Sequence, residues 1–279
     1  VYIADMRQEL KTGNRTIFSR KLYELISDRL NKHEQIMLFL NKRGTAGFVS
    51  CRSCGYVMKC PHCDVSMTLH RNGKLVCHYC GYETPNVSLC PECGSKYILG
   101  FKAGTEAVED AVKKMFPAAR VLRMDMDTTK GKGGHENILS AFATEQADIL
   151  IGTQMIVKGH DFPKVTLVGV VAADISLYAS DYKAVERTFQ LITQAAGRAG
   201  RGERKGEVVI QTYSPDNYGL LCAAEQNYKS FYEQEMSYRK LLSYPPVNNM
   251  VKINISSINE KLLSERAGNI KALIQQYIQ

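Results

Sequence analysis

Eight of the nine cysteines lie between Cys51 and Cys93 as four C-x-x-C pairs. Thiolates at this spacing are ligands that tetrahedral zinc prefers, and eight of them saturate two ions. A site closed by four thiolates leaves no coordination position for a substrate, so we expect two structural zinc ions here. The pairs are Cys51/Cys54, Cys60/Cys63, Cys77/Cys80 and Cys90/Cys93.

The residues that follow each pair also favour metal-binding turns. A chain that turns sharply after the second cysteine needs positive φ, which Gly55, Gly81 and Gly94 supply without steric cost and Asp64 tolerates. The dipeptide Asn72-Gly73, between two apolar runs, predicts a β-hairpin in the middle of the segment.

Four pairs can share two ions in three ways. We favour a nested arrangement, because the hairpin brings Cys60/Cys63 against Cys77/Cys80 and leaves Cys51/Cys54 to meet Cys90/Cys93. Four disulfides in a secreted module are the alternative, which the rest of the chain disfavours. Since the thiolates suffice as ligands, we expect the histidines of this segment to lie beside the sites or on the surface; they are His62, His70 and His78.

Composition sets further limits. The chain has 279 residues, 44% of them hydrophobic, which is enough for two or three units. It contains neither an apolar run of about 18 residues nor a secretion signal, so we expect a cytoplasmic protein without a membrane partner. The net charge of +8 permits nucleic-acid binding without proving it. Since the chain opens at Val1 and ends in a helix-like run, we expect a part of a longer protein.

Outside the cysteine segment, short apolar runs alternate with helical stretches, which predicts a parallel sheet covered by helices. The cysteine segment would then be an insertion after the first strand. A long helical run, a strand-like segment and a last helix follow at 217–242, 250–256 and 260–278. The expected strands of the sheet are 35–41, 120–125, 148–152, 165–171 and 207–212, and the expected helices are 19–32, 105–116, 135–143 and 182–196.

Loops near the carboxyl ends of the strands are where ligands bind to open α/β sheets. Three segments stand out there: 41–44, with Lys42 and Arg43; 152–163, rich in small and hydroxyl residues; and 194–202. In the third, Gln194, Arg198 and Arg201 have the i, i+4, i+7 spacing of one helix face. Two guanidinium groups on one face indicate an anionic partner.

Together these features resemble the C-terminal half of a bacterial family of replication-restart helicases, PriA or primosomal protein N′. The three segments resemble the fourth, fifth and sixth helicase motifs, and 174–177 and 181–187 resemble the approach to the sixth. Four C-x-x-C pairs inserted into a second RecA-like lobe distinguish this family from related helicases. The resemblance covers nearly the whole chain.

The resemblance implies a fold and a set of roles. Residues 1–50 and 95–216 would form the RecA-like lobe, 51–94 the zinc module, and 217–279 a linker helix with a truncated α+β C-terminal domain. The implied roles are arginine fingers at the γ-phosphate of ATP for Arg198 and Arg201, nucleotide contact or coupling for Gln194, Gly159 and Asp161, and DNA contact for Lys42, Arg43, Thr153 and Gln154.

The implied activity is that of an ATP-dependent 3′-to-5′ DNA helicase, with Mg²⁺ beside the ATP. It would bind stalled or abandoned forks and initiate primosome assembly in the bacterial nucleoid, with forked and single-stranded DNA, primosome proteins and single-strand-binding protein as partners. These 279 residues contain no G-x-x-x-x-G-K-[ST] loop and no acidic box, so we expect them to be inactive alone. The alternative is a non-catalytic zinc-ribbon adaptor that binds nucleic acid or protein independently of nucleotide.

Overall fold

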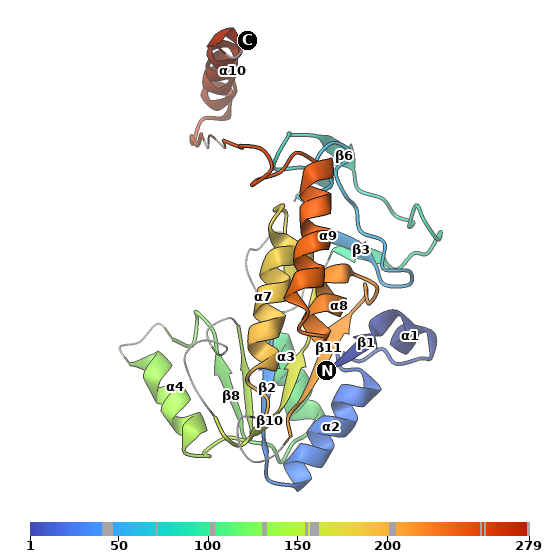
Figure 1. The fold of residues 1–279 in the computed structure, drawn as a ribbon, viewed down its shortest axis with the longest axis vertical. Helices are drawn as coiled ribbons and strands as arrows, with labels where there is room; N and C mark the ends of the chain where they lie inside the picture. The colour runs from blue at the N-terminus through green and yellow to red at the C-terminus, as the bar shows by residue number, and fades with distance from the viewer. Residues whose placement is uncertain are drawn as a thin grey trace. The chain divides into compact units, whose positions relative to one another are not determined.

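The computed structural model describes residues 1–40, 47–70, 72–100, 104–129, 133–153, 156, 162–200, 205–251, 253 and 255–277. These divide into two compact units, 1–235 and 236–279. In the first unit, six parallel strands form a sheet in the order β1-β11-β10-β2-β9-β8 (Figure 1). The strands are β1 (Tyr2–Asp5), β2 (Gln35–Phe39), β8 (Val121–Met124), β9 (Ile149–Gly152), β10 (Val165–Val170) and β11 (Glu207–Thr212).

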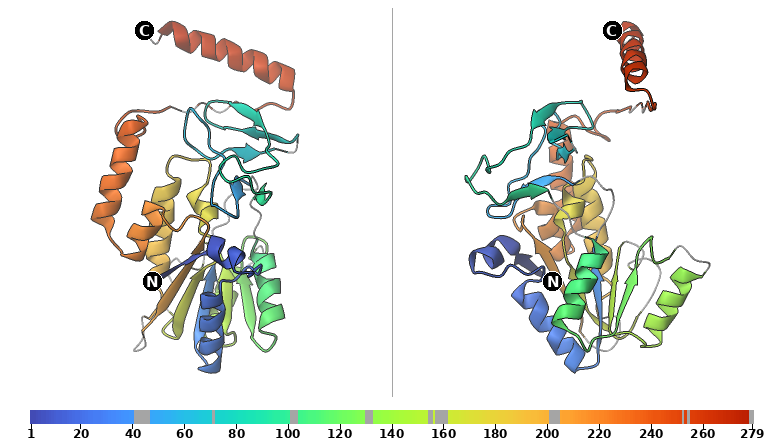
Figure 2. Two further views of the ribbon diagram at one scale, coloured as in Figure 1. Left: turned by 90° about the vertical axis from the view of Figure 1, so that its right-hand side faces the viewer. Right: turned by 180° about the vertical axis from the view of Figure 1, so that it is seen from behind.

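Burial on both faces explains why the central strands are almost continuously apolar. Every residue of β2, β9 and β10 is buried, as in parallel sheets that helices cover on both sides. Successive side chains of a strand point to opposite faces, so Met37 and Phe39 enter one core whereas Ile36 and Leu38 enter the other. Figure 2 shows these two helical layers. The second core is covered by α2 (Arg20–Asn31) and α3 (Thr105–Met115), and the first by α4 (Gly134–Ala143), α7 (Ala184–Ala196) and α8 (Tyr218–Ala224).

The predicted strands and helices of this unit are confirmed. Each of the five strands and four helices expected from the sequence is present, with bounds that differ by at most two residues. The sequence analysis missed the edge strand β1, whose four residues include the half-exposed Tyr2 and carry no strong apolar signal. It also missed the short helix α6 (Asp174–Leu177) that follows β10.

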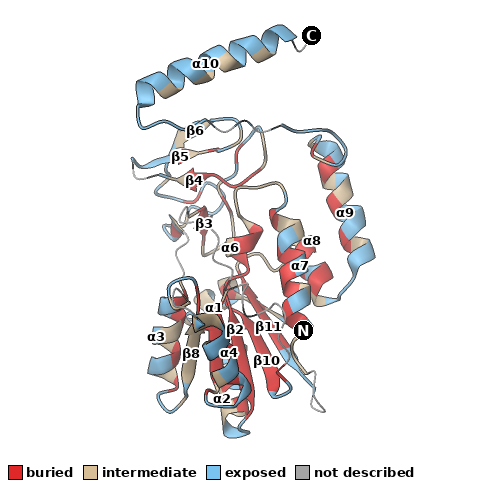
Figure 3. Ribbon diagram, turned by 90° about the vertical axis from the view of Figure 1, so that its left-hand side faces the viewer, coloured by how far each residue is buried: buried red, intermediate tan, exposed pale blue. Residues whose placement is uncertain are grey.

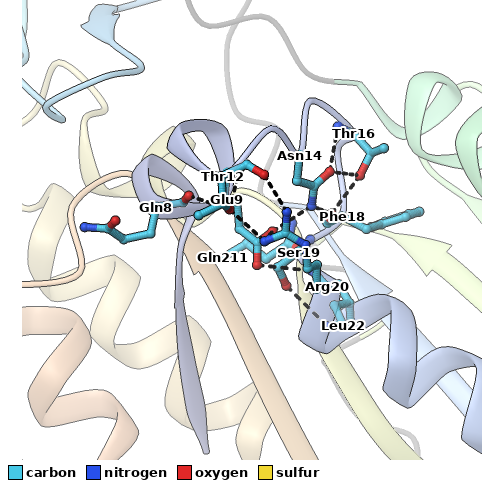
Figure 4. A network of polar contacts seen from close by, with 10 residues as sticks. All are labelled: Gln8, Glu9, Thr12, Asn14, Thr16, Phe18, Ser19, Arg20, Leu22 and Gln211. Carbon is cyan, nitrogen blue, oxygen red and sulfur yellow. Dashed lines mark hydrogen bonds and ion pairs between the residues drawn. The ribbon is translucent and has the colours of Figure 1, made fainter.

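Polar contacts fix the path from β1 through α1 (Met6–Lys11) to α2 (Figure 4). The buried Gln211 side chain on β11 accepts a hydrogen bond from the Ser19 amide at 2.7 Å and donates one to the Ile17 carbonyl at 2.8 Å. Asn14 donates through Nδ2 to Glu9 Oε2 at 2.7 Å. The contacts of Gln211 join parts of the sequence more than 190 residues apart, so no local pattern in the sequence predicts them.

The cysteine segment is inserted after β2 and is joined to the lobe by two short antiparallel strands, β3 (Val49–Cys51) and β7 (Ile98–Gly100). Val49 lies opposite Gly100, so the chain enters and leaves the insertion at one place. The expected hairpin is confirmed, with β4 (Thr68–Leu69) antiparallel to β5 (Lys74–Val76). A third strand, β6 (Glu83–Pro85), completes a three-stranded sheet. We call residues 51–93 the zinc module.

The segment after β11 differs from the long helix that the sequence suggested. Two helices form, α8 and α9 (Tyr228–Leu241), with a break at 225–227. Gln226 adopts a φ of 54°, which ends α8, and the Asn227 side chain accepts a hydrogen bond from the Ser230 amide at 3.0 Å to start α9. Gln226 thus ends one helix and Asn227 caps the amino end of the next, so the chain forms two helices and not one.

The second unit contains the end of α9 and helix α10 (Glu260–Tyr277). The strand expected at 250–256 is wrong for the described residues of that segment, none of which lies in a strand. Alternating residues form a strand only beside a partner, and the described part of 236–279 offers no second strand. Among the described helices, none is both long enough and apolar enough to cross a membrane.

Candidate metal centres and helicase motif residues

Four turns of nearly identical geometry carry the eight cysteines. After each C-x-x-C pair, the next residue adopts positive φ, as predicted: 84° at Gly55, 50° at Asp64, 76° at Gly81 and 68° at Gly94. In each turn that residue's amide donates to the carbonyl of the first cysteine, as Gly55 does to Cys51 at 2.9 Å. The backbone alone therefore directs both thiols of each pair to the same side.

The cysteines gather into two clusters, and in each the sulfur atoms all lie within 4.8 Å of one another. Their membership is the nested arrangement favoured from the sequence. The Sγ atoms of Cys51 and Cys93 are 3.7 Å apart, and those of Cys60 and Cys80 are 3.5 Å apart. The clusters are Cys51, Cys54, Cys90, Cys93 and Cys60, Cys63, Cys77, Cys80.

The sulfur spacing fits zinc and does not fit disulfides. A tetrahedral ion with Zn–S bonds of 2.3 Å separates its sulfur ligands by roughly 3.8 Å, whereas a disulfide bond is about 2.05 Å long. The nine cysteines, all within the described residues, form no disulfide. The two four-cysteine sites thus fit structural zinc, and their ligand sets leave no position open for catalysis.

Burial and hydrogen bonding shift the pKa values of the thiols in different directions. Burial raises the pKa of Cys54 to about 12 and holds that of Cys63 well above its usual range. Burial also opposes ionisation of Cys51, but hydrogen bonds from the Cys54 and Ser53 amides lower its pKa to about 7. A bound Zn²⁺ would supply the charge that allows all four thiolates of a cluster to form.

The histidines of the module lie where the sequence analysis expected them. His62 packs edge-on against Tyr82, with ring centroids 5.4 Å apart. His70 and His78 are exposed and contact each other, with their Nε2 atoms 3.4 Å apart. Both cysteine clusters are complete without an imidazole ligand.

The zinc module packs directly on the lobe through the turn at Gly55. A Cβ atom at this position would lie 2.2 Å from the carbonyl oxygen of Tyr213, just after β11. Next to it, the Arg52 guanidinium lies 4.7 Å from the centre of the Tyr213 ring. Burial lowers the pKa of Arg52, an effect that the nearby Tyr213 and Asp174 oppose. The backbones of the two regions are therefore in contact, with a partly buried cation beside the contact.

Asp174, the first residue of α6, lies next to Tyr213, which contacts Gly55 and Arg52 of the module. Its carboxylate accepts hydrogen bonds from the Tyr213 amide at 3.1 Å and the Thr212 hydroxyl at 3.1 Å. Burial raises its pKa to about 6, although these hydrogen bonds act in the opposite direction. The sequence analysis noted 174–177 without assigning Asp174 a role.

Thr153, expected to contact DNA, lies at the carboxyl edge of the sheet, directly after β9. It is partly exposed, and its carbonyl accepts a hydrogen bond from the Ile156 amide at 3.1 Å. The preceding Gly152 has no space for a side chain, because a Cβ would lie 2.5 Å from Ile156 and 2.8 Å from the Met124 carbonyl. The end of β9 at Gly152 is thus tightly packed between Ile156 and β8.

Arg198 lies at the opposite edge of the sheet. Helix α7 ends at Ala196, and the following turn is held by a hydrogen bond of 3.0 Å from the Gly200 amide to the carbonyl of Val165, the first residue of β10. A Cβ at Gly206, just before β11, would lie 2.2 Å from the Ala199 backbone. The turn therefore packs against the amino ends of the strands.

This placement corrects two expectations. The segment 194–202 was grouped with loops at the carboxyl edge, but its turn lies at the amino edge because α7 runs back across the sheet. Arg198 also does not continue the helical face of Gln194. Helix α7 ends at Ala196, and the tighter turn that follows is held by a hydrogen bond of 3.0 Å from the Arg198 amide to the Ala195 carbonyl. Gly200, with a φ of 74°, ends this turn after Arg198. Gln194 is exposed in the last turn of α7 and Arg198 is partly buried beyond it.

Six residues expected at nucleotide or DNA sites lie outside the described residues. They are Arg201, Gly159, Asp161, Lys42, Arg43 and Gln154.

Comparisons with known proteins bear on both parts of the first unit. The PriA DNA helicase Cys-rich region domain matches residues 60–85, and the helicase conserved C-terminal domain matches residues 93–203. The Replication restart protein PriA of Bacillus subtilis strain 168 is 53% identical over 257 residues, which cover 92% of this chain and 32% of that protein. Its counterpart from Synechocystis is 45% identical over 283 residues, covering 100% of this chain and 34% of its own length, and that of Chlamydia trachomatis is 41% identical over 281 residues, covering 99% and 37%.

The parallel sheet with its inserted pair of four-cysteine sites is a RecA-like helicase lobe with a zinc-binding ribbon. The chain belongs to the PriA family of replication restart helicases. It spans about a third of the length of the curated relatives it matches.

Residues that join the zinc module to the lobe escaped the sequence analysis. Ser66, Tyr79 and Ser180 form part of this junction, as do Arg52 and Tyr213. The position of Tyr79 inside a C-x-x-C pair is the one signal in the sequence that points to this junction. The others carry no local signal, since their partners are distant in sequence.

Proposed function

We propose that the chain is the second motor lobe and zinc module of an ATP-dependent 3′-to-5′ DNA helicase. The observation that carries this proposal is the combination of a helicase C-terminal lobe with an arginine, Arg198, on a turn held by two strands. A preorganised guanidinium can stabilise the charge that develops on a transferred phosphoryl group, because it needs little rearrangement when the reaction occurs.

In this proposal Arg198 and Arg201 reach the γ-phosphate of an ATP molecule, with its Mg²⁺, held by a first lobe. Gln194, Gly159 and Asp161 contact the nucleotide or couple it to DNA, and the DNA contacts are Lys42, Arg43, Thr153 and Gln154. The sequence has no phosphate-binding G-x-x-x-x-G-K-[ST] loop, so these 279 residues alone would not hydrolyse ATP.

The biological role follows from the family. The helicase would bind stalled or abandoned replication forks, with forked and single-stranded DNA as ligands, and would initiate primosome assembly through contacts with primosome proteins and single-strand-binding protein. The zinc module, which is rigid once its ions are bound, would meet the duplex junction or these protein partners.

The test is ATP turnover by the full-length protein with Arg198→Ala. An arginine finger contributes roughly 10³- to 10⁵-fold to phosphoryl transfer, so DNA-stimulated turnover should fall to the background of the assay while fork binding is retained. Arg120→Ala is the control, because Arg120 also lies at the amino edge of the sheet, just before β8, and is outside the segments that resemble helicase motifs; its guanidinium pairs with Asp148 at 2.5 Å. Normal turnover by the Arg198 variant would remove the finger assignment.

A further inference from the structure

A short segment of the lobe receives several side-chain hydrogen bonds from the hairpin of the zinc module and the residues that flank it. Residues 178–182, between α6 and α7, are called here the docking segment. Ser66 Oγ donates to the Tyr178 carbonyl at 2.6 Å, and Ser180 Oγ donates back to the Ser66 carbonyl at 2.9 Å. Thr68 Oγ1 lies 3.1 Å from Ser180 Oγ. The module and the docking segment are thus joined by reciprocal hydrogen bonds, and the module residues that form them, Ser66 and Thr68, are buried.

A second contact to the docking segment comes from within a metal site. Tyr79 lies between Cys77 and Cys80, and its hydroxyl accepts a hydrogen bond from the Tyr182 amide at 3.1 Å. The same hydroxyl lies 3.4 Å from Asp181 Oδ1, and Asp181 pairs through its other oxygen with Arg187 of α7 at 2.6 Å. Tyr79, whose backbone position is set by the neighbouring cysteines Cys77 and Cys80, therefore contacts the residues that lead directly into α7.

Helix α7 connects this junction to Arg198. It begins at Ala184, two residues after the docking segment, and at 1.5 Å per residue its 13 residues span about 20 Å. Seven of them are buried, and α7 packs against α8 on one side and the sheet on the other (Figure 3). Arg198 follows the helix by two residues. A well-packed helix of this length moves as one body, so a displacement at its start is transmitted to its end.

We propose that the docking segment and α7 transmit the position of the zinc module to Arg198, with Tyr79 and Ser180 as positioning residues. DNA that presses on the module would move the docking segment and, through α7, change the reach of Arg198 toward the nucleotide. This inference rests on the proposed motor function, because it concerns how DNA controls the same arginine.

The module is linked to the docking segment by side-chain hydrogen bonds that can be removed by substitution, so the link can be tested without unfolding the module or the lobe. The buried core of the module is separate from the two cores of the lobe, so each retains its own packing when these hydrogen bonds are removed. The double variant Tyr79→Phe/Ser180→Ala removes four hydroxyl contacts and keeps the tyrosine ring. Lys74→Ala is the control, because it breaks an exposed ion pair with Glu83 within the module at 2.8 Å.

The experiment compares ATP turnover of the full-length protein with and without forked DNA. The ratio of the two rates is the measurement, since a loss of folded protein lowers both rates equally and cancels. We expect the ratio to fall roughly 2- to 30-fold in the double variant, the range found for substitutions along coupled networks. The ratio should be unchanged in Lys74→Ala and retained in Ser180→Thr, which keeps the hydroxyl, with two zinc ions per chain in every variant.

An unchanged ratio in the double variant, including one in which both rates fall together, would overturn the relay while the motor function stands. A second measurement does not depend on ATP turnover: forked DNA should slow amide hydrogen exchange in α7 of the unmodified protein and have no such effect in the double variant. If the unmodified protein shows this protection but no DNA-stimulated turnover, the motor function fails and the mechanical link remains. Equal protection in both proteins would overturn the link.

Discussion

The RecA-like lobe and the zinc module are built on different physical principles. The lobe has two large apolar cores, one on each face of its sheet, and its only core cysteine among the described residues is Cys222. In the core that the module shares with its two linking strands, β3 and β7, four of the nine residues are cysteines of the metal sites, and no strand exceeds three residues. Strands this short bury too little apolar surface to be stable alone. The lobe is therefore held by burial, whereas the module depends on metal binding.

Removal of zinc should give the largest difference in folding between the zinc module and the lobe. Structural zinc sites contribute about 10–16 kcal/mol of apparent binding free energy in small domains, so chelation should unfold residues 51–93. The sheet contains no metal ligand and should stay folded. Amide hydrogen exchange after chelation would show this as loss of protection in β4–β6 with protection retained in β2, β9 and β10.

Re-addition of zinc is the control for that measurement, and protection in the module should return. Loss of protection throughout the sheet on chelation would mean that the lobe depends on the module for its own folding, which contradicts the separation of the cores.

Two glycines at equivalent positions should distinguish folding of the module from its contact with the lobe. Gly55 and Gly81 each follow a C-x-x-C pair at φ of 84° and 76°, so alanine carries a similar backbone penalty of about 1–2 kcal/mol at both. Only at Gly55 would the new Cβ meet the Tyr213 carbonyl, at 2.2 Å, while nothing lies within 4 Å at Gly81. We expect Gly55→Ala to lower the free energy of unfolding by about 1–3 kcal/mol more than Gly81→Ala does.

Urea unfolding of the zinc-loaded variants gives this difference directly. Since the backbone penalty is common to both, equal destabilisation would show that the module yields at Gly55 without resistance from the lobe. The rigid contact on which a mechanical link depends would then be absent at that point.

Gly55 and Gly81 show which structural features the sequence predicts and which it does not. Their positive φ follows from local chemistry, because a turn after two cysteines needs it, and the hairpin at Asn72-Gly73 is equally local. The central strands were predictable because burial on both faces imposes continuous apolar runs. The different surroundings of Gly55 and Gly81 could not be predicted, since Tyr213 lies more than 150 residues after Gly55 in the sequence.

The position of Arg198 in the fold could not be predicted from the sequence for a similar reason. The composition of 194–202 indicated anion binding, but which edge of the sheet receives the turn depends on the direction in which α7 packs. Hydrogen bonding to Val165 and close packing at Gly206 fix that direction, and both are tertiary contacts. Local pattern thus predicts anion binding, which stays a prediction, whereas long-range packing decides where the turn lies.

The smallest expected effect concerns protons at the boundary between the two regions. Burial raises the pKa of Asp174 to about 6 from its ordinary value of 3.8, so the folded protein retains a proton that the unfolded chain has lost between about pH 4 and pH 6. The free energy of unfolding must therefore fall as the pH rises through this window. Asp174→Asn keeps a neutral group of the same shape and should lack this fall, so its stability relative to the unmodified protein should rise by about 1–3 kcal/mol from pH 4.5 to pH 7.

Asp125, at the carboxyl end of β8 within the lobe, provides a control of opposite sign. Burial opposes its ionisation, but hydrogen bonds from the Thr105 hydroxyl and from the Thr128 and Asp127 amides hold its pKa below the ordinary value. Asp125→Asn should therefore lose stability relative to the unmodified protein as the pH rises from about 3 to 5. Both variants keep all eight zinc ligands, so loss of zinc in acid cancels when urea unfolding is compared at each pH. If Asp174→Asn showed no pH dependence, Asp174 would be solvated like an ordinary carboxylate, and if it had the sign of Asp125→Asn, the pKa of Asp174 would lie below its ordinary value. Either result would mean that burial does not dominate at Asp174, and the contact of Arg52 with Tyr213 would not be dry and packed.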